Sequence, residues 1–156
     1  MNSSIVTNWS EARPARPYAT VGISLVCLIL LVIYYFVSPI LQQAMIEVGG
    51  MQPGAVSALL FQSPGQWMKY PAITVLSAIF LHASWLHLAG NLAYLWVFGI
   101  PVEQRIGTAG MIALFLTGGA LANVIVALQL GNLDAPIIGA SGAISAVVGA
   151  YLGLFP

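Results

Sequence analysis

The stretch from Val21 to Val37 contains no charged side chain, and two further stretches, about Ser84–Ile100 and Gly110–Leu130, share this property. Each is close to the roughly 20 apolar residues that an α-helix needs to cross a bilayer. Of the 156 residues, 60% are hydrophobic and only 5% are charged, whereas soluble domains have roughly 25% charged residues. A chain with so few charges cannot cover its surface for water, so we expect an integral membrane protein.

The few charges exclude other classes. Four basic and four acidic residues give a net charge of zero, with no basic block to attract nucleic acid. The single cysteine, Cys27, cannot form an internal disulfide. Arg13 and Arg16 precede the first apolar stretch as in a signal peptide, but this stretch is longer than a typical signal core and no cleavage site follows promptly. A retained signal anchor is therefore favoured over a cleaved one.

The pattern predicts an all-α, polytopic membrane helix bundle in a single domain, 18–156, after a polar lead, 1–17. Four membrane helices are expected, at about 18–41, 84–100 and 110–130, with the last starting near Ser141 and still running at Pro156. The half-apolar connector 42–70 is expected to lie in the membrane interface. A short turn holding Glu103 and Arg105 is expected between the second and third helices, and a loop of turn-forming residues, 131–136, before the fourth.

Basic residues predict the orientation. If the first three helices all cross, Arg13, Arg16 and Arg105 fall on one side of the membrane and Lys69 on the other. Because basic residues concentrate in cytoplasmic loops, we expect a cytoplasmic N-terminus. The loop around Asp134 and the start of the last helix would then face outward.

Both histidines of the chain lie in one short segment, His82-x4-His87-x3-Asn91. His87 and Asn91 are four residues apart, so on a helix they share a face. Polar side chains inside a membrane are costly and tend to mark function, although the same residues could form a polar seam that holds helices together. No carboxylate or cysteine lies nearby, so a metal site is not expected.

A second polar cluster is Gly139-Ala140-Ser141-Gly142, after a turn and at the start of a helix. The first N–H groups of a helix have no internal partner, and a hydroxyl beside such donors is what acyl transfer needs. The alternative is a plain serine N-cap, which is common. Beyond it, Gly142, Ser145, Gly149 and Gly153 form a nearly bare helix face, which favours close packing against another helix.

Together, in this order, these clusters resemble the rhomboid family of intramembrane serine proteases. The matching pieces are the His82, His87 and Asn91 segment, then Gly99-x2-Val102-Glu103-x-Arg105-x-Gly107, then Gly139-x-Ser141-Gly142 and the glycine face beyond it. The likeness covers about Ala72–Pro156 and reaches the first helix only generically.

The resemblance implies a role for each of these residues. Ser141 would be the nucleophile, and the side chains of His87 and Asn91, with the backbone N–H of Ser141, would stabilise the oxyanion. His82, Gly139 and Gly142 would support the site. Glu103 and Arg105 would form a structural polar pair, with Gly149 and Gly153 as packing positions. The substrates would be transmembrane helices of other membrane proteins, cut without metal or cofactor in a plasma (inner) membrane.

This sequence departs from the family pattern in two ways. The Trp-Arg pair that often precedes the first histidine is replaced by Ile73-Thr74, with Trp67 and Lys69 slightly earlier. The family's general base is a histidine in a sixth helix, and no histidine follows Ser141 here. We therefore expect a chain that holds four of six membrane helices and is inactive alone. The alternatives are a non-catalytic rhomboid-like protein that binds transmembrane clients and, with less support, a channel or transporter fragment.

Overall fold

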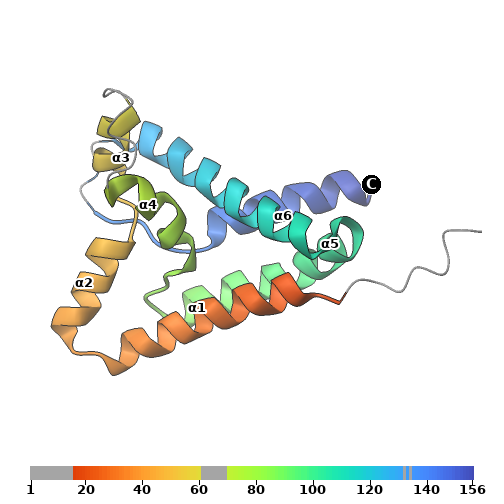
Figure 1. Cartoon of the computed structure of the whole chain (residues 1–156), viewed down its shortest axis with the longest axis horizontal. Coiled ribbons are helices and arrows are strands. Elements are labelled where there is room, and N and C mark those ends of the chain that lie inside the picture. The colour runs from red at the N-terminus through yellow and green to blue at the C-terminus, as the bar shows by residue number, and fades with distance from the viewer. Residues whose placement is uncertain (1–15, 61–69, 132, 134) are drawn as a thin grey trace, which may run out of the picture.

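The described part of the chain is entirely helical apart from turns and loops. The computed structural model describes residues 16–60, 70–131, 133 and 135–156. The helices are α1 (Tyr18–Phe36), α2 (Pro39–Gly49), α3 (Pro53–Leu60), α4 (Tyr70–Ser77), the 3₁₀ turn η2 (Ala78–Phe80), α5 (Trp85–Gln129) and α6 (Ser141–Leu154) (Figure 1). The prediction of an all-α fold is confirmed. Most of the polar lead, together with Trp67, Lys69 and Asp134, lies outside the described residues.

Two helices, α1 and α5, are long and apolar enough to cross a membrane, and α6 is a shorter apolar helix. The first helix ends at Phe36, earlier than the predicted Leu41, because the proline at 39 disfavours helical backbone in the residue before it. Ser38 instead caps α2: its hydroxyl accepts a hydrogen bond from Leu41 N, and Pro39 occupies the first turn. Proline suits that position because its missing N–H would be unpaired there anyway.

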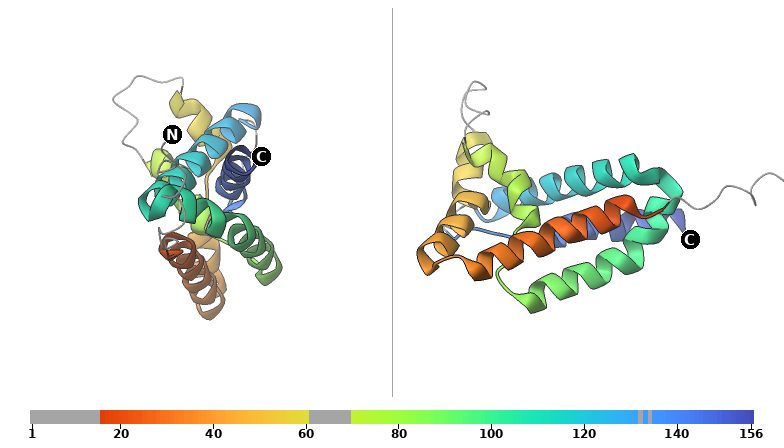
Figure 2. Two further views of the ribbon diagram at one scale, coloured as in Figure 1. Left: turned by 90° about the vertical axis from the view of Figure 1, so that its right-hand side faces the viewer. Right: turned by 60° about the horizontal axis from the view of Figure 1, so that its bottom comes forward.

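Helix α5 contains a sharp kink at Gly107, where φ is 79° and ψ is 165°. The predicted turn at Glu103 and Arg105 was therefore wrong: both residues are helical, and the chain bends at the glycine that follows. A positive φ is costly for residues with a Cβ, and glycine adopts it freely. The kink divides α5 into two arms, 85–106 and 108–129, which lie on opposite sides of α1 in the right-hand view of Figure 2.

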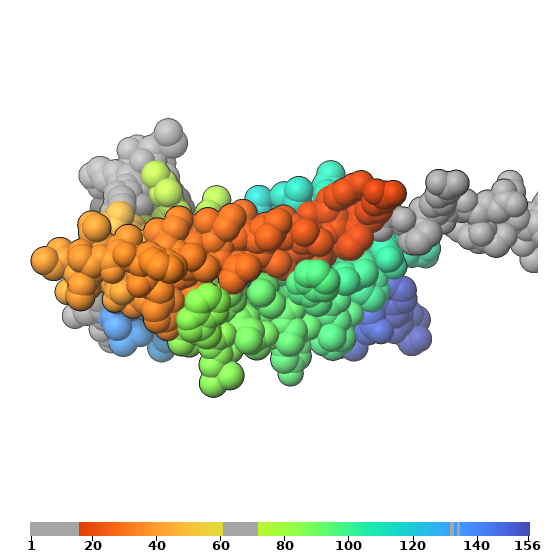
Figure 3. Space-filling view, turned by 90° about the horizontal axis from the view of Figure 1, so that it is seen from below, coloured from red at the N-terminus to blue at the C-terminus, as the bar shows by residue number. Residues whose placement is uncertain are grey.

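The arms have different neighbours. The first lies along α1, and much of α1 remains open on this face (Figure 3). The second lies along α6, where small residues meet: Gly119 faces Ala143, and Gly142 faces Ala122. Because any Cβ on these glycines would crowd the opposite helix, the two backbones approach closely, as small-residue interfaces in membranes allow. The buried core between the arms includes Phe115 and, from η2, Ile79.

The carboxylate of Glu103 joins three parts of this bundle. It is fully buried and accepts hydrogen bonds from Ala19 N at 2.7 Å, Thr20 N at 2.8 Å, Thr20 Oγ1 at 2.8 Å and Thr108 Oγ1 at 2.9 Å. The first two donors are N–H groups at the start of α1 that have no partner within the helix, and the helix dipole there favours negative charge. Glu103 therefore fastens the start of α1 and the start of the second arm to the end of the first.

We expect Glu103→Ala to lower the free energy of unfolding by about 3 kcal/mol, because it leaves buried donors without an acceptor. Glu103→Gln keeps one acceptor oxygen, so its free energy of unfolding should fall by less. Thermal unfolding in detergent micelles measures both variants against the unchanged chain. Equal stability of all three would contradict a fastening role for the carboxylate.

Candidate active site

The first turn of α5 places His87 and Asn91 on one helix face. Ser84 caps the helix, its hydroxyl accepting a hydrogen bond from His87 N at 3.2 Å. Because the helix starts at Trp85, His87 lies in its first turn and Asn91 one turn later, as the sequence predicted. Both side chains are at least partly open to the surroundings.

His82 lies three residues before the helix and is buried, with 2% of its surface exposed. Its Nδ1 is 3.3 Å from the carbonyl oxygen of Phe80, and its Nε2 is 2.9 Å from Nδ2 of Asn91. Burial is the main cause that lowers the pKa of His82 below its usual value, and the neighbouring His87 lowers it slightly further. His82 is therefore neutral at pH 7, as buried histidines without an acidic partner tend to be.

The loop before α6 is held against the middle of the chain. Met51 and Ile137 exchange two backbone hydrogen bonds of 2.9 and 2.8 Å. Gly139 N then donates to the carbonyl oxygen of Ala78 at 2.9 Å. These bonds bring the residues just before Ser141 onto η2, beside the start of α5.

Gly139 is where the two predicted clusters meet. Its φ is +123°, and a Cβ there would lie 2.7 Å from Cε1 and 2.8 Å from Nε2 of His87, and 3.8 Å from Nδ2 of Asn91. The backbone thus passes directly against the His87 ring, which only a residue without a side chain permits. His87 and Asn91 therefore lie beside the chain two residues before Ser141.

Ser141 is the first residue of α6, and its hydroxyl makes no hydrogen bond with any described residue. The helix cap is Ala140, so Ser141 does not act as the N-cap. The serine opens onto a cavity of about 380 Å³ shared with Asn91, Tyr94, Ile144, Ser145 and Val148. Sequence reasoning missed Tyr94, although its position three residues after Asn91 places it on the same helix face.

The other predicted site residues lie elsewhere. Glu103 is bonded to α1, as described above, while Arg105 is exposed, and no ion pair joins the two within the described residues. Gly142 packs against Ala122, whereas a Cβ on Gly149 or Gly153 would meet no atom within 4 Å. The described residues contain no group of His, Cys, Asp or Glu that could hold a metal.

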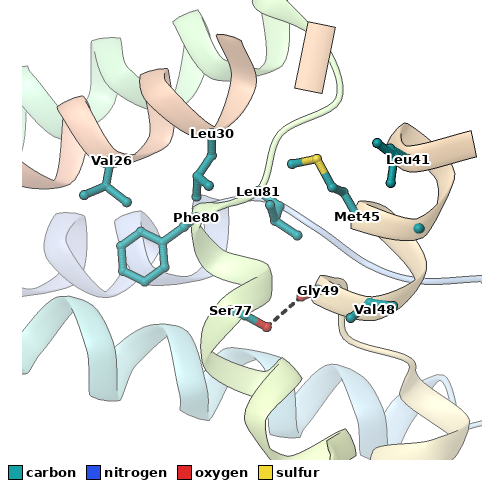
Figure 4. A pocket seen from close by; sticks show the side chains of 10 residues that line it. Val26, Leu30, Leu41, Met45, Val48, Gly49, Ser77, Phe80 and Leu81 are labelled. Atoms are coloured by element: carbon teal, nitrogen blue, oxygen red, sulfur yellow. Dashed lines mark hydrogen bonds between the residues drawn. The ribbon is translucent and has the colours of Figure 1, made fainter. Parts of the chain in front are cut away.

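A separate pocket of about 480 Å³ lies between α1, α2 and η2 and is lined by apolar side chains such as Leu30, Met45 and Phe80 (Figure 4). Its one hydroxyl, on Ser77, already donates to the carbonyl oxygen of Gly49 at 2.7 Å. This pocket offers no nucleophile, acid or base, so the cavity at Ser141 is the candidate active site.

Comparison with known proteins identifies the family. Residues 64–156 match the family model of the Rhomboid domain. The chain belongs to the rhomboid family. It is 35% identical over 91 residues to "Rhomboid-like protein 11, chloroplastic" of Arabidopsis thaliana, covering 58% of this chain and 30% of the relative. It is 30% identical over 89 residues to "Rhomboid protein 1, mitochondrial" of Saccharomyces cerevisiae, covering 54% and 25%.

A human relative, "Rhomboid-related protein 3", is 35% identical over 77 residues, which cover 49% of this chain and 19% of the relative. The chain thus spans less than a third of the length of these curated relatives. Membership of the rhomboid family also supports its assignment as a membrane protein with apolar helices.

We expect Gly139→Ala to destabilise this rhomboid domain by about 1–3 kcal/mol, because the new methyl group would strain the positive φ and meet the His87 ring. Gly149→Ala is the matched control. It lies inside a helix with open space around it, so alanine should be neutral or stabilise by up to about 1 kcal/mol. Thermal unfolding compares them, and equal losses would contradict the close approach at Gly139.

The lowered pKa of His82 predicts how stability depends on pH. Below a pH of about 6.5 the unfolded chain binds a proton at this histidine more readily than the folded one. Stability should therefore be full above this pH and fall as the pH drops toward the folded-state pKa of His82. Unfolding midpoints measured over this range should show the fall, and His82→Gln should reduce it. If stability fell with pH as steeply in His82→Gln as in the unchanged protein, the pH dependence would belong to another titratable group.

Proposed function

We propose that this rhomboid chain carries the nucleophile and the oxyanion-binding side of an intramembrane serine endopeptidase. Ser141 is the nucleophile, and His87, Asn91 and the backbone N–H of Ser141 bind the oxyanion of the tetrahedral intermediate. The observation that carries the proposal is the passage of Gly139 against His87 and Asn91, immediately before Ser141. Preorganised donors of this kind usually supply the largest part of catalysis in acyl transfer.

The start of α6 supports the proposal. Its first backbone bond within the helix is from Ile144 N to the carbonyl oxygen of Ala140, so the N–H groups of Ser141, Gly142 and Ala143 precede that ladder. These donors and the positive end of the helix dipole favour negative charge beside the Ser141 hydroxyl. The serine is open to the cavity rather than buried in the core, so a substrate carbonyl can reach it.

The arrangement of helices supports four membrane passages in the described part, formed by α1, the two arms of α5 and α6. The start of α1, the kink of α5 and the end of α6 lie at one end of the bundle (Figure 1). Arg16 and Arg105 lie at this end, which we propose is cytoplasmic. Ser141 then lies on the outer side.

The substrates we propose are transmembrane helices of other proteins, which would reach Ser141 from within the bilayer. A serine needs a neighbouring base to become a strong nucleophile, and residues 142–156 contain no histidine. The proposal therefore assigns the base that accepts the Ser141 proton to a group outside residues 142–156. Because the relatives include a chloroplastic and a mitochondrial protein, family membership does not select the plasma membrane.

A second candidate function is the binding of transmembrane helices without cleavage. The observation that favours it is the Ser141 hydroxyl, which has no hydrogen-bond partner among the described residues. The two candidates share the same cavity and differ only in whether Ser141 reacts.

A fluorophosphonate probe, which reacts with activated serines, separates the two functions. In the protein made from the complete gene, we expect the probe to label the unchanged protein and to spare Ser141→Ala. The matched control is Ser145→Ala, which removes a hydroxyl one turn away in the same cavity and should still be labelled. Labelling of Ser141→Ala would contradict the nucleophile assignment, and labelling of neither protein would favour the binding function. Residues 1–156 alone should cleave no transmembrane substrate.

A further inference from the structure

His82 has two hydrogen-bond partners that constrain its protonation. The carbonyl oxygen of Phe80 only accepts hydrogen bonds, and Nδ2 of Asn91 only donates them. Nδ1 of His82 faces the first at 3.3 Å and Nε2 faces the second at 2.9 Å. Nδ1 must therefore carry a proton and Nε2 must not. Of the three protonation forms of imidazole, only the neutral Nδ1–H tautomer makes both bonds.

This requirement also fixes the side chain of Asn91. An amide can turn over and exchange the places of its nitrogen and oxygen, and its hydrogen-bond partners decide between the two. The Phe80 carbonyl alone holds a proton on Nδ1, and the buried ring has no acidic partner among the described residues to keep it charged, so Nε2 is an acceptor whichever way the amide lies. The nitrogen of Asn91 therefore takes the shared position, and it is also the Asn91 atom nearest to the Cβ position of Gly139. One of its two N–H groups is used by His82, and the other remains for a ligand.

We propose that neutral His82 is a positioning residue that keeps the amide nitrogen of Asn91, and not its oxygen, turned toward the Ser141 site. The inference rests on the proposed function, in which Asn91 donates to the oxyanion. A turned amide would present its oxygen to the oxyanion, and two negative partial charges would repel each other. His82 thereby acts through Asn91, without touching the substrate.

Protonation of His82 would reverse this preference. With a proton on both ring nitrogens, Nε2 becomes a donor and favours the oxygen of Asn91. Among the described residues, the titratable groups near His82 are His87, whose ring centre is 5.1 Å away, and Tyr35, whose hydroxyl donates to the neighbouring Ala83 carbonyl at 3.4 Å. Neither is an acid that would hold a proton on His82 near neutral pH.

Nitrogen-15 NMR of labelled histidine tests the tautomer directly in residues 1–156 in detergent micelles. The chain has only two histidines, and the spectrum of His82→Gln assigns them. We expect the Nδ1–H tautomer at His82 near pH 7.5, and a weaker preference for it in Asn91→Leu, where only the Phe80 carbonyl still favours it. An Nε2–H tautomer, or a charged ring at this pH, would overturn the inference whether or not the protein is a peptidase.

A pair of variants tests the consequence in the protein made from the complete gene. The amide group of glutamine matches the position of Nε2 and offers an oxygen to Asn91, whereas that of asparagine matches Nδ1 and leaves Asn91 without its acceptor. We expect His82→Gln to keep most of the fluorophosphonate labelling of Ser141, with a shallower decline in acid. Labelling of Ser141 in His82→Asn should be about tenfold slower, the effect of losing roughly one hydrogen bond.

The control is Thr117→Val, which changes a polar helix residue on the second arm of α5, outside the site. The probe should label this variant as fast as the unchanged protein. If the unchanged protein labels at Ser141 but both His82 variants behave alike, the positioning role fails while the proposed function stands. If Ser141→Ala labels as well as the unchanged protein, the proposed function fails, and the NMR result alone decides the tautomer.

Discussion

The buried carboxylate of Glu103 is the interaction on which the arrangement of the bundle depends. Bilayer hydrocarbon offers no hydrogen bonds, so polar groups inside a membrane protein must be satisfied by the protein itself. Glu103 does this for two N–H groups of α1 and for the hydroxyl of Thr108 just after the kink. Once these segments are joined, the directions of α1 and both arms of α5 are set together, and the opposite end of the first arm carries His87 and Asn91.

Close packing between α5 and α6 then fixes the position of Ser141 relative to these helices. Apolar helices gain little from associating in a lipid environment that is itself apolar, so contact depends on how closely they fit. Gly119 and Gly142 let α6 approach the second arm of α5 to within contact of alanine side chains. Asn123 adds a hydrogen bond of 2.8 Å to the carbonyl oxygen of Val75, which ties the same arm to α4. The start of α6 is thereby held beside η2, and Gly139 reaches the His87 ring.

Sequence patterns predicted those parts of the fold that depend on local chemistry. Apolar stretches located α1, both arms of α5 and α6, and the four-residue spacing placed His87 and Asn91 on one face. The bend was misplaced because Glu103 and Arg105 interrupt the apolar stretch without ending the helix, which continues past them to Gly107. The hydrogen-bond partners of Glu103 and His82 could not be predicted from the sequence. A partner of Glu103 lies 84 residues away, and His82 bonds to a backbone carbonyl whose direction is set by the fold.

The contacts that shape the candidate site separate its two chemical tasks. The proposed oxyanion side lies between Ala78 and Ser141, where Gly139 bonds to η2 and Asn91 bonds to His82. None of these contacts uses a proton acceptor for Ser141, so the donor side keeps its shape without one. Because electrostatic preorganisation belongs to the donors and nucleophile activation belongs to the base, loss of a base would leave a formed cavity that still fits a peptide carbonyl. On the two proposed functions, cleavage and binding of transmembrane helices would therefore differ in the base alone and share the same packed core.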